Sequence, residues 1–108
     1  ELGSDVPQGK YRLDALLTPT TPTTAFPIGA IYGDSVLMQY SDQFTVTANH
    51  AGIPGISLPG GIAADGLPIG VQLLGPDYSE HTLLQMGRSF EIGTQDEVWR
   101  SQKPAVLR

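Results

Sequence analysis

GIPGISLPGGIAADGLPIGVQLLGP, residues 52–76, mixes residues that favour buried strands with prolines and glycines that interrupt them. Proline cannot donate a hydrogen bond to a sheet, and an interior glycine weakens a strand. The sequence therefore predicts a strand in GISLPGG that stops at Pro59 and Gly60, a polar connection at AADG, and a second strand in LPIGVQLLG. The long apolar run of the second strand predicts burial on both faces. The spacing leaves open whether the two strands pair directly as a hairpin.

The segments before this stretch predict a strand, a loop and a helical region. Leu13–Thr18, LDALLT, is a short apolar run that ends at Pro19, and we expect a buried strand there. PTTPTTAFPIG then predicts an extended loop, because its prolines interrupt regular structure. From Asp34, which can serve as an N-cap, apolar residues recur at helical spacing as far as Gly52. Weak helix formers after Phe44 leave two forms open, one bent helix or two short ones.

The segment after residue 76 predicts a final helix and a tail. Ser79 is a suitable N-cap, and apolar residues follow it on one helical face. Gly87 lies inside this helix, where glycine is less favourable than alanine by about 1 kcal/mol, so we expect a close approach to another backbone. Residues 94–108 form the tail, in which Trp99 should pack its ring against the domain. With residues 1–10 as a polar lead-in, the pattern predicts a single α/β domain.

The composition excludes several classes of function. The 108 residues contain no cysteine, so disulfides, thiol nucleophiles and thiolate metal sites are absent. A net charge of −5 disfavours a nucleic-acid-binding face, because sequence-independent affinity for phosphates comes from clustered Lys and Arg. No apolar run reaches the roughly 20 residues that span a bilayer, and no secretory signal pattern occurs. We therefore expect a soluble protein, with the cytoplasm as its default compartment.

Residue patterns alone identify no complete catalytic site. Ser57 lies in GISLP, which nearly matches the G-x-S-x-G turn that presents a nucleophilic serine, but proline replaces the second glycine. His50 and His81 could act as general bases, yet their spacing matches neither a catalytic nor a zinc-binding pattern. Asp42 stands within an apolar helical pattern, which leaves it either a solvated helix residue or a ligand-binding group. Asn49 could brace the backbone at the end of this helical region.

Longer segments between residues 13 and 92 resemble a known family. General amidases share the segments N-x-x-G-x-P and G-L-P-x-G-x-Q, which Asn49–Pro54 and Gly66–Gln72 match. Asp42, Thr45 and Val46, together with the tract TPTTPTTAF, are similar to a narrower branch, the glutaminase subunits of tRNA-dependent amidotransferases. The full combination resembles the C-terminal part of the amidase signature family; its segments are LLTPTTPTTAFPIG, SDQFTVTANHAGIPGISLPGG and GLPIGVQLLGPDYSEHTLL.

The resemblance implies a fold and one binding residue. The chain would be a C-terminal fragment of an amidase domain, the C-terminal portion of its mixed-sheet α/β/α sandwich, with residues 52–76 supplying two strands. In the amidotransferase branch, the aspartate that matches Asp42 helps to hold the substrate glutamine by its amino group. This role is physically reasonable, because an ammonium that enters a pocket needs a carboxylate to offset its desolvation. His50 departs from the branch, which commonly has an apolar residue at that position.

The resemblance also implies that the reaction itself is carried by residues outside this sequence. The family hydrolyses amides with a serine nucleophile activated through a second serine and a lysine. The Gly/Ser-rich signature that carries these residues does not occur in the 108 residues, so no catalytic residue is assigned here. We therefore expect no amidase activity from this piece alone.

Partners and cofactors follow from the same resemblance. The parent subunit would release ammonia from glutamine for the amidation of a tRNA-bound glutamate, with tRNA, ATP and Mg held by other amidotransferase subunits. We expect no cofactor or metal in this chain, and self-association through exposed sheet edges. Two alternatives remain open: a general amidase that acts on small amides without tRNA, and a non-catalytic scaffold or assembly module that kept only this part of the fold.

Overall fold

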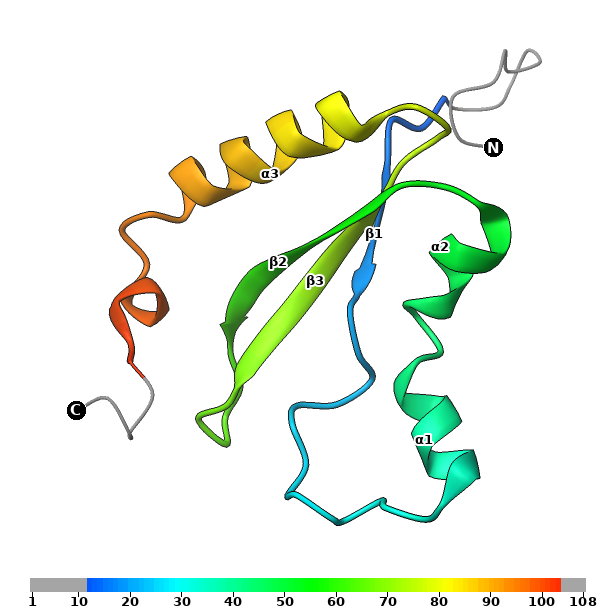
Figure 1. Cartoon of the computed structure of the whole chain (residues 1–108). Helices are drawn as coiled ribbons and strands as arrows, with labels where there is room; N and C mark the ends of the chain where they lie inside the picture. The colour runs from blue at the N-terminus through cyan, green and yellow to red at the C-terminus, as the bar shows by residue number, and fades with distance from the viewer. Residues whose placement is uncertain (1–11, 104–108) are drawn as a thin grey trace.

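The computed structural model describes residues 12–103, which form a three-stranded sheet with helices on either side (Figure 1). The expected lead-in, residues 1–10, and the last part of the tail, residues 104–108, lie outside the described residues. The α/β class predicted from the sequence is confirmed. The elements occur in the order β1 (Leu16–Pro19), α1 (Ser35–Ser41), α2 (Val46–Ala51), β2 (Gly55–Ile62), β3 (Pro68–Leu74), α3 (Glu80–Gly93) and the 3-10 helix η1 (Val98–Ser101).

The sheet has the order β1-β3-β2, and both pairings are antiparallel. β2 and β3 pair directly as a hairpin, which settles the question that their spacing left open. In the connection, the Ala63 N–H donates to the Leu67 carbonyl and the Gly66 N–H donates to the Ala63 carbonyl, each at 2.9 Å. The mixed sheet implied by the resemblance is therefore not seen within residues 12–103, where every strand pair is antiparallel.

β2 continues through Pro59, where the sequence predicted that it would stop. Within the part of the chain that the structure describes, β2 is an edge strand, and proline is tolerated in edge strands because its missing N–H can face solvent. The register shifts between Pro59 and Gly61, which leaves Gly60 as a β-bulge. A Cβ on Gly60 would stand 2.8 Å from Val71 Cγ1, so a larger residue would displace that side chain. The glycines after Pro59 therefore mark a bulge and not the end of the strand.

Helices cover both faces of the sheet. Ile56 and Leu58 of β2 point to one face, where a Cβ built on Gly87 of α3 would lie 3.3 Å from each of their side chains. Successive strand residues alternate between faces, so Gly55 points to the other face, toward Ala48 of α2. Gly87 thus lies close to the sheet, but the predicted approach to another backbone is wrong, because the nearest atoms are side chains of β2.

The helical region after Asp34 forms two short helices, one of the two forms that the sequence allowed. The Asp34 carboxylate caps α1, because its Oδ1 accepts from the N–H groups of Val36 and Leu37, both at 3.0 Å. Gly52 ends α2 in the left-handed conformation, with φ at 69°. Ser79 occupies the predicted N-cap position of α3, but its hydroxyl makes no capping hydrogen bond. Within residues 12–103, no helix combines the length and apolar character that crossing a membrane requires.

The core lies around the end of β3, where residues on both faces of the strand are buried. Gln72, Leu73 and Leu74 are consecutive and all buried, so both faces of this end of β3 are covered, as predicted. The expectation of a buried strand at Leu13–Thr18 is wrong in its extent and burial, because β1 runs from Leu16 to Pro19 and Leu17 is 69% exposed. The reason is that α3 packs against β2 and not over β1, which leaves Leu17 uncovered within the described residues.

Asp65 joins the β2–β3 connection to the loop that follows β1. Its Oδ1 accepts from the Leu67 N–H at 2.9 Å, and its Oδ2 accepts from the Thr24 hydroxyl at 2.7 Å. Both hydrogen bonds favour the charged carboxylate and lower the pKa of Asp65 below its ordinary value of 3.8. The bond from the Leu67 N–H has the larger effect, and the bond from the Thr24 hydroxyl has the smaller one. The pKa of Asp65 is therefore lower in the folded protein than in the unfolded chain. The contribution of these bonds to the stability of the fold is present at pH values above the unfolded-state pKa and is lost as pH falls through the folded-state pKa.

Replacing Thr24 with valine is expected to raise the pKa of Asp65 toward 3.8, and the Leu67 N–H should keep it below that value. A suitable control is Thr21→Val, because the Thr21 hydroxyl donates to the Thr23 carbonyl at 2.8 Å and not to Asp65. An NMR titration of the Asp65 carboxyl group in both variants measures the difference. Equal pKa values in the two variants would contradict the contact between the loop and the hairpin.

Candidate functional site

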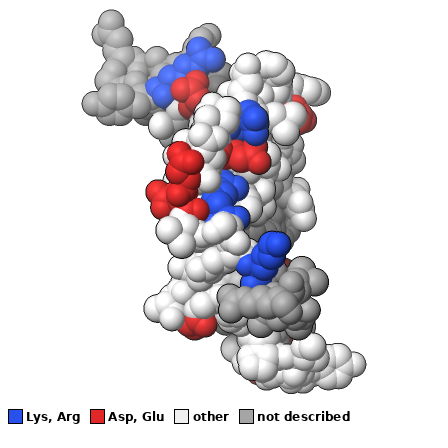
Figure 2. Space-filling view, turned by 90° about the vertical axis from the view of Figure 1, so that its left-hand side faces the viewer, with Lys and Arg blue, Asp and Glu red and all other residues white. Residues whose placement is uncertain are grey.

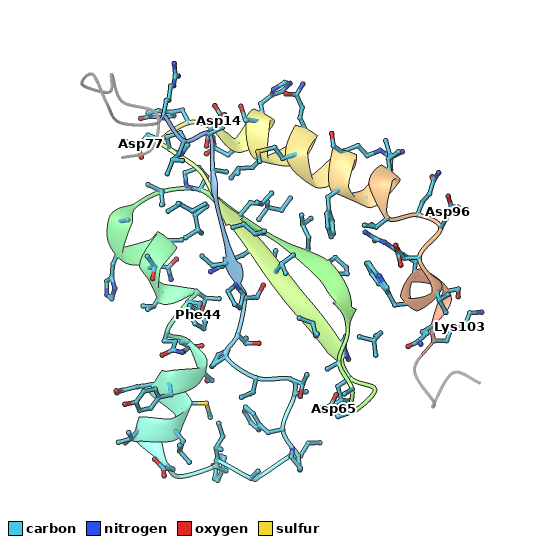
Figure 3. All side chains as sticks on the ribbon, turned by 180° about the vertical axis from the view of Figure 1, so that it is seen from behind. Asp14, Phe44, Asp65, Asp77, Asp96 and Lys103 are labelled. Atoms are coloured by element: carbon cyan, nitrogen blue, oxygen red, sulfur yellow. The ribbon has the colours of Figure 1, made fainter. Side chains whose placement is uncertain are left out.

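A buried glutamine on the central strand connects three elements. Gln72 of β3 is only 5% exposed, and its Nε2 donates to Thr18 Oγ1 of β1 at 2.9 Å and to the Phe44 carbonyl at 2.7 Å. Phe44 lies at the junction between α1 and α2 (Figure 3). A buried amide without partners is destabilising, and these bonds explain how a polar side chain is accommodated in an otherwise apolar run.

Asp42 lies in the turn that connects α1 to α2, two residues before Phe44. The Asp42 carbonyl accepts from the N–H groups of Thr45 and Val46 at 3.0 and 2.9 Å, and from the Thr45 hydroxyl at 3.1 Å. These bonds fix the backbone of the turn, whereas Asp42 itself is exposed to solvent. The carboxylate is therefore available to a cationic or polar ligand, while the backbone that carries it is held in place.

Hydroxyl groups line the side of the sheet that faces this turn. Ser57 and Thr18 pair with Gln72 from the two neighbouring strands, so all three side chains share one face. Thr20 extends the row, because its hydroxyl lies 2.9 Å from Ser57 Oγ. Gly70 allows this contact: a Cβ there would stand 2.9 Å from Thr20 Oγ1. We call Thr18, Thr20, Ser57 and Gln72 the polar sheet face.

The other candidates from the sequence are not brought together into a catalytic group. Ser57 hydrogen-bonds Thr20 rather than a histidine. His50 is exposed in the last turn of α2, and His81 is exposed in the first turn of α3 on the opposite side of the sheet. Within residues 12–103, no three His, Asp or Glu side chains gather in a way that could hold a metal ion.

Asn49 and Gln72 both differ from what the sequence patterns indicated for them. Asn49 is exposed within α2, and Gly52 forms the C-cap instead. In the sequence, Gln72 is identified only as the last position of the G-L-P-x-G-x-Q segment. A glutamine among buried strand residues does indicate an internal hydrogen-bonding role. Its partner could not be found from spacing, because Phe44 lies 28 residues earlier in the chain.

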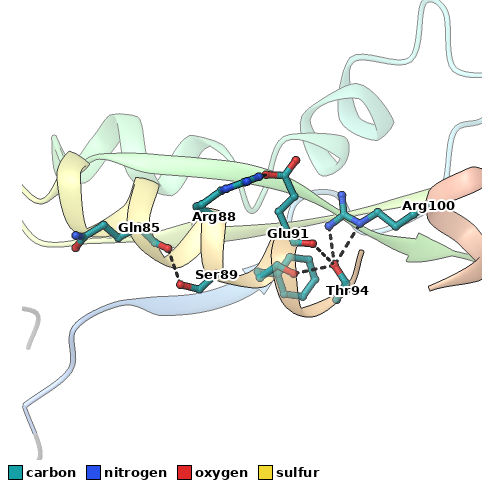
Figure 4. Close-up of polar contacts among 7 residues, drawn as sticks. Gln85, Arg88, Ser89, Glu91, Thr94 and Arg100 are labelled. Carbon is teal, nitrogen blue, oxygen red and sulfur yellow. Dashed lines mark hydrogen bonds and ion pairs between the residues drawn. The ribbon is translucent and has the colours of Figure 1, made fainter. Parts of the chain in front are cut away.

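A cleft of about 350 Å³ lies on the opposite face of the sheet, between β2, α3 and η1. Arg100 is fixed beside it, because its Nε and Nη2 donate to Thr94 Oγ1 at 3.2 and 2.7 Å (Figure 4). The Arg100 guanidinium also lies 4.5 Å from the ring centre of Trp99, which is half-buried. The cleft is lined by Ile56, Leu58, Pro59, Leu84, Gly87, Arg88, Phe90, Glu91 and Arg100. Since the sheet separates this cleft from Asp42, the two do not form one site.

The charge on this side of the molecule is mixed. Figure 2 shows acidic and basic side chains interspersed on a largely uncharged surface. Arg88 and Glu91 of α3, for example, form an ion pair at 2.6 Å. Among the described residues, the face in Figure 2 carries no extended basic surface of the kind that binds a nucleic-acid backbone.

Comparison with known proteins gives consistent results. A family model described as Amidase matches residues 7–84. The A subunit of glutamyl-tRNA(Gln) amidotransferase from Streptococcus pyogenes serotype M5 (strain Manfredo) is 44% identical over 94 residues, which are 87% of this chain and 18% of that protein. The protein of the same name from serotype M49 (strain NZ131) has the same identity and coverage.

The fold comparison agrees with the sequence comparison. The crystal structure of the A subunit of glutamyl-tRNA(Gln) amidotransferase from Thermotoga maritima matches with a TM-score of 0.67 and 44% identity, over 72% of this chain and 17% of that one. This chain therefore spans less than a fifth of the length of the relatives that it matches. The family model covers well over half of the chain, and the resemblance seen in the sequence motifs is confirmed. This chain belongs to the amidase family.

Proposed function

We propose that this chain is the C-terminal part of the glutaminase subunit of a tRNA-dependent amidotransferase. That subunit hydrolyses glutamine and supplies ammonia for converting Glu-tRNA(Gln) to Gln-tRNA(Gln). The 44% identity to the A subunit of glutamyl-tRNA(Gln) amidotransferase supports this assignment, since the aligned 94 residues are 87% of the chain and necessarily include Asp42. The observation that carries the proposal is the exposed Asp42 carboxylate on a turn held against the polar sheet face.

In this proposal Asp42 binds the amino group of the substrate glutamine. An ammonium group loses water when it enters a site, and a charge-assisted hydrogen bond to a carboxylate offsets that loss. The turn fits this role because its backbone is fixed by bonds to the Asp42 carbonyl, while the side chain faces solvent. Asp42 thus positions the substrate and takes no part in bond cleavage.

The bond-breaking residues and the partners belong, in this proposal, to the rest of the enzyme. A serine nucleophile, a second serine and a lysine would come from an upstream part of the parent subunit, within the larger amidase sandwich. Partner subunits would hold tRNA, ATP and Mg, and we place the assembly in the cytoplasm. The 108-residue piece alone is then inactive and prone to self-association, so glutamine turnover by the piece or a strictly monomeric piece in light scattering would contradict these expectations.

Asp42→Asn tests the proposal in the polypeptide as its source cell makes it, with its co-purifying subunits. Loss of the charge-assisted hydrogen bond should raise KM for glutamine by roughly 10- to 100-fold. Hydrolysis of glutaramate, which is glutamine without its α-amino group, should change by less than about twofold, because this substrate offers Asp42 no ammonium. Asp96→Asn is the matched control, since Asp96 is an exposed carboxylate beyond the end of α3, far from Phe44 (Figure 3).

Two results would contradict the Asp42 assignment. One is an unchanged KM for glutamine in Asp42→Asn, and the other is an equal loss with glutamine and glutaramate. The second would indicate that the carboxylate supports the fold and does not recognise the amino group.

A general amidase is the second candidate, favoured by the breadth of the family model, whose description names no tRNA. The two candidates differ in their partners. Hydrolysis of simple amides at a rate that is indifferent to tRNA-binding subunits would favour the general amidase, and co-purification with such subunits would favour the amidotransferase. A native protein of only this size, seen by intact mass, would instead favour the scaffold or assembly module.

A further inference from the structure

We infer that Gln72 is a positioning residue for Asp42, and this inference rests on the proposed role of Asp42 in substrate binding. The Gln72 amide holds the α1–α2 turn against the sheet through the Phe44 carbonyl, at 2.7 Å. Phe44 is two residues from Asp42, in the same turn, where Thr45 and Val46 donate hydrogen bonds to the Asp42 carbonyl. The position of the Asp42 carboxylate relative to the sheet therefore depends on Gln72.

The chemistry of the partners fixes the orientation of the Gln72 amide. The atom that faces the Phe44 carbonyl must be the NH₂ group, because two carbonyl oxygens cannot hydrogen-bond each other. The second contact of the same nitrogen is Thr18 Oγ1, at 2.9 Å, and the Thr18 hydroxyl itself donates to the Pro19 carbonyl at 3.1 Å. Both amide protons of Gln72 are thus engaged inside the fold. The nitrogen cannot donate to a substrate without giving up one of these bonds, which favours positioning over direct contact.

Apolar packing contributes little to the placement of the turn. Neither α1 nor α2 contains a buried residue. At the position where α2 comes nearest to Gly55, a Cβ built on Gly55 would make an ordinary van der Waals contact with Ala48 Cβ at 3.9 Å, and glycine leaves that contact unmade. The buried hydrogen bond from Gln72 should therefore influence the position of the turn more than it would in a well-packed core. Few other contacts within the described residues oppose a shift of α1 and α2.

The test uses Gln72→Met in the native polypeptide with its co-purifying subunits. Methionine has a similar length but no amide protons, so it leaves the Phe44 carbonyl without its donor. Gln85→Met is the matched control, because Gln85 is exposed on α3, on the other side of the sheet. We expect Gln72→Met to raise KM for glutamine by about tenfold with little change in kcat. KM for glutaramate should stay within about twofold, and Gln85→Met should change neither value.

A second measurement does not depend on activity. Hydrogen exchange of peptides that contain Thr45 and Val46 reports the two N–H groups that bond the Asp42 carbonyl. Exchange at these amides should become about tenfold faster in Gln72→Met, while the amides of β2 and β3 keep their rates. Thr18→Val removes the other acceptor of the Gln72 amide but leaves Phe44, so it should give a smaller increase at the same peptides.

The outcomes separate this inference from the proposed function. If Asp42→Asn raises KM but Gln72→Met changes neither KM nor exchange in the turn, the positioning role is wrong. If Gln72→Met accelerates exchange equally in the turn and in β2 and β3, Gln72 is a general structural residue and the inference also fails. If exchange rises in the turn alone but Asp42→Asn leaves KM unchanged, Gln72 holds the turn and the proposed function of Asp42 is wrong.

Discussion

Replacing Leu83 with alanine is expected to lower the free energy of unfolding by about 2–5 kcal/mol. Leu83 is 2% exposed, on the face of α3 that packs against the end of β3, where its side chain lies 3.2 Å from the position of a Cβ on Gly75. The buried apolar side chains among residues 12–103 are only Leu73, Leu74 and Leu83. Because Leu83 is almost completely buried among these residues, its truncation removes packed apolar contacts and leaves a cavity, so the loss should be large.

The neighbouring leucine provides the control for this prediction. Leu84 is 62% exposed, and Leu84→Ala should change the free energy of unfolding by less than about 0.5 kcal/mol. Thermal or denaturant unfolding of the protein as its cell makes it compares the two variants. Equal losses would mean that the exposed face of α3 is covered in the native protein, and that these three leucines are not its main core.

Replacing Gly87 with leucine is expected to have the second large effect, a loss near the upper end of about 1–3 kcal/mol. A Cβ at this position already lies 3.3 Å from Ile56 Cδ1 and Leu58 Cδ2, so a methyl group would need those side chains to move by a few tenths of an ångström. The longer leucine side chain would push α3 away from β2. Leu83 would then be partly uncovered as well.

Gly93→Leu is the matched control, because nothing lies within 4 Å of a Cβ at Gly93, in the last position of α3. The same substitution there should be neutral or slightly stabilising, since leucine is a better helix former than glycine. Thermal or denaturant unfolding of both variants compares their free energies of unfolding. A Gly87→Leu protein as stable as Gly93→Leu would show that α3 does not pack on β2 as described.

Local sequence signals predicted much of the fold, and the exceptions have physical causes. Asp34 and Gly52 mark helix ends because the capping chemistry is local, and both were found where the pattern predicted. Pro59 misled the prediction of β2, because proline ends an inner strand but is tolerated at a sheet edge, and edge position is a property of the whole sheet. The burial predicted for β1 is wrong at Leu17 for a similar reason, since the exposure of Leu17 depends on where α3 lies.

The candidate site was less predictable than the fold. Asp42 lies in a turn, although the apolar spacing around it indicated a helical segment, and only the family resemblance pointed to the role that we propose for it. Gln72 carried a usable signal, a polar amide within an apolar run, but its contact with Phe44 forms only when β3 and the α1–α2 turn come together. The periodic patterns of strands and helices predict which face of an element a residue occupies. They do not predict which distant backbone carbonyl its side chain will hydrogen-bond.

The bulge in β2 also determines how this sheet can interact with other strands. A strand from another molecule that paired along the outer edge of β2 would meet a register shift at Gly60 and no N–H at Pro59. Bulges and prolines of this kind protect natural edge strands from amyloid-like stacking. The opposite edge, formed by β1, has no such bulge in its pairing with β3. For the sheet formed by residues 12–103, we therefore expect strand addition to be favoured beside Leu16–Thr18, before Pro19, and disfavoured beside β2.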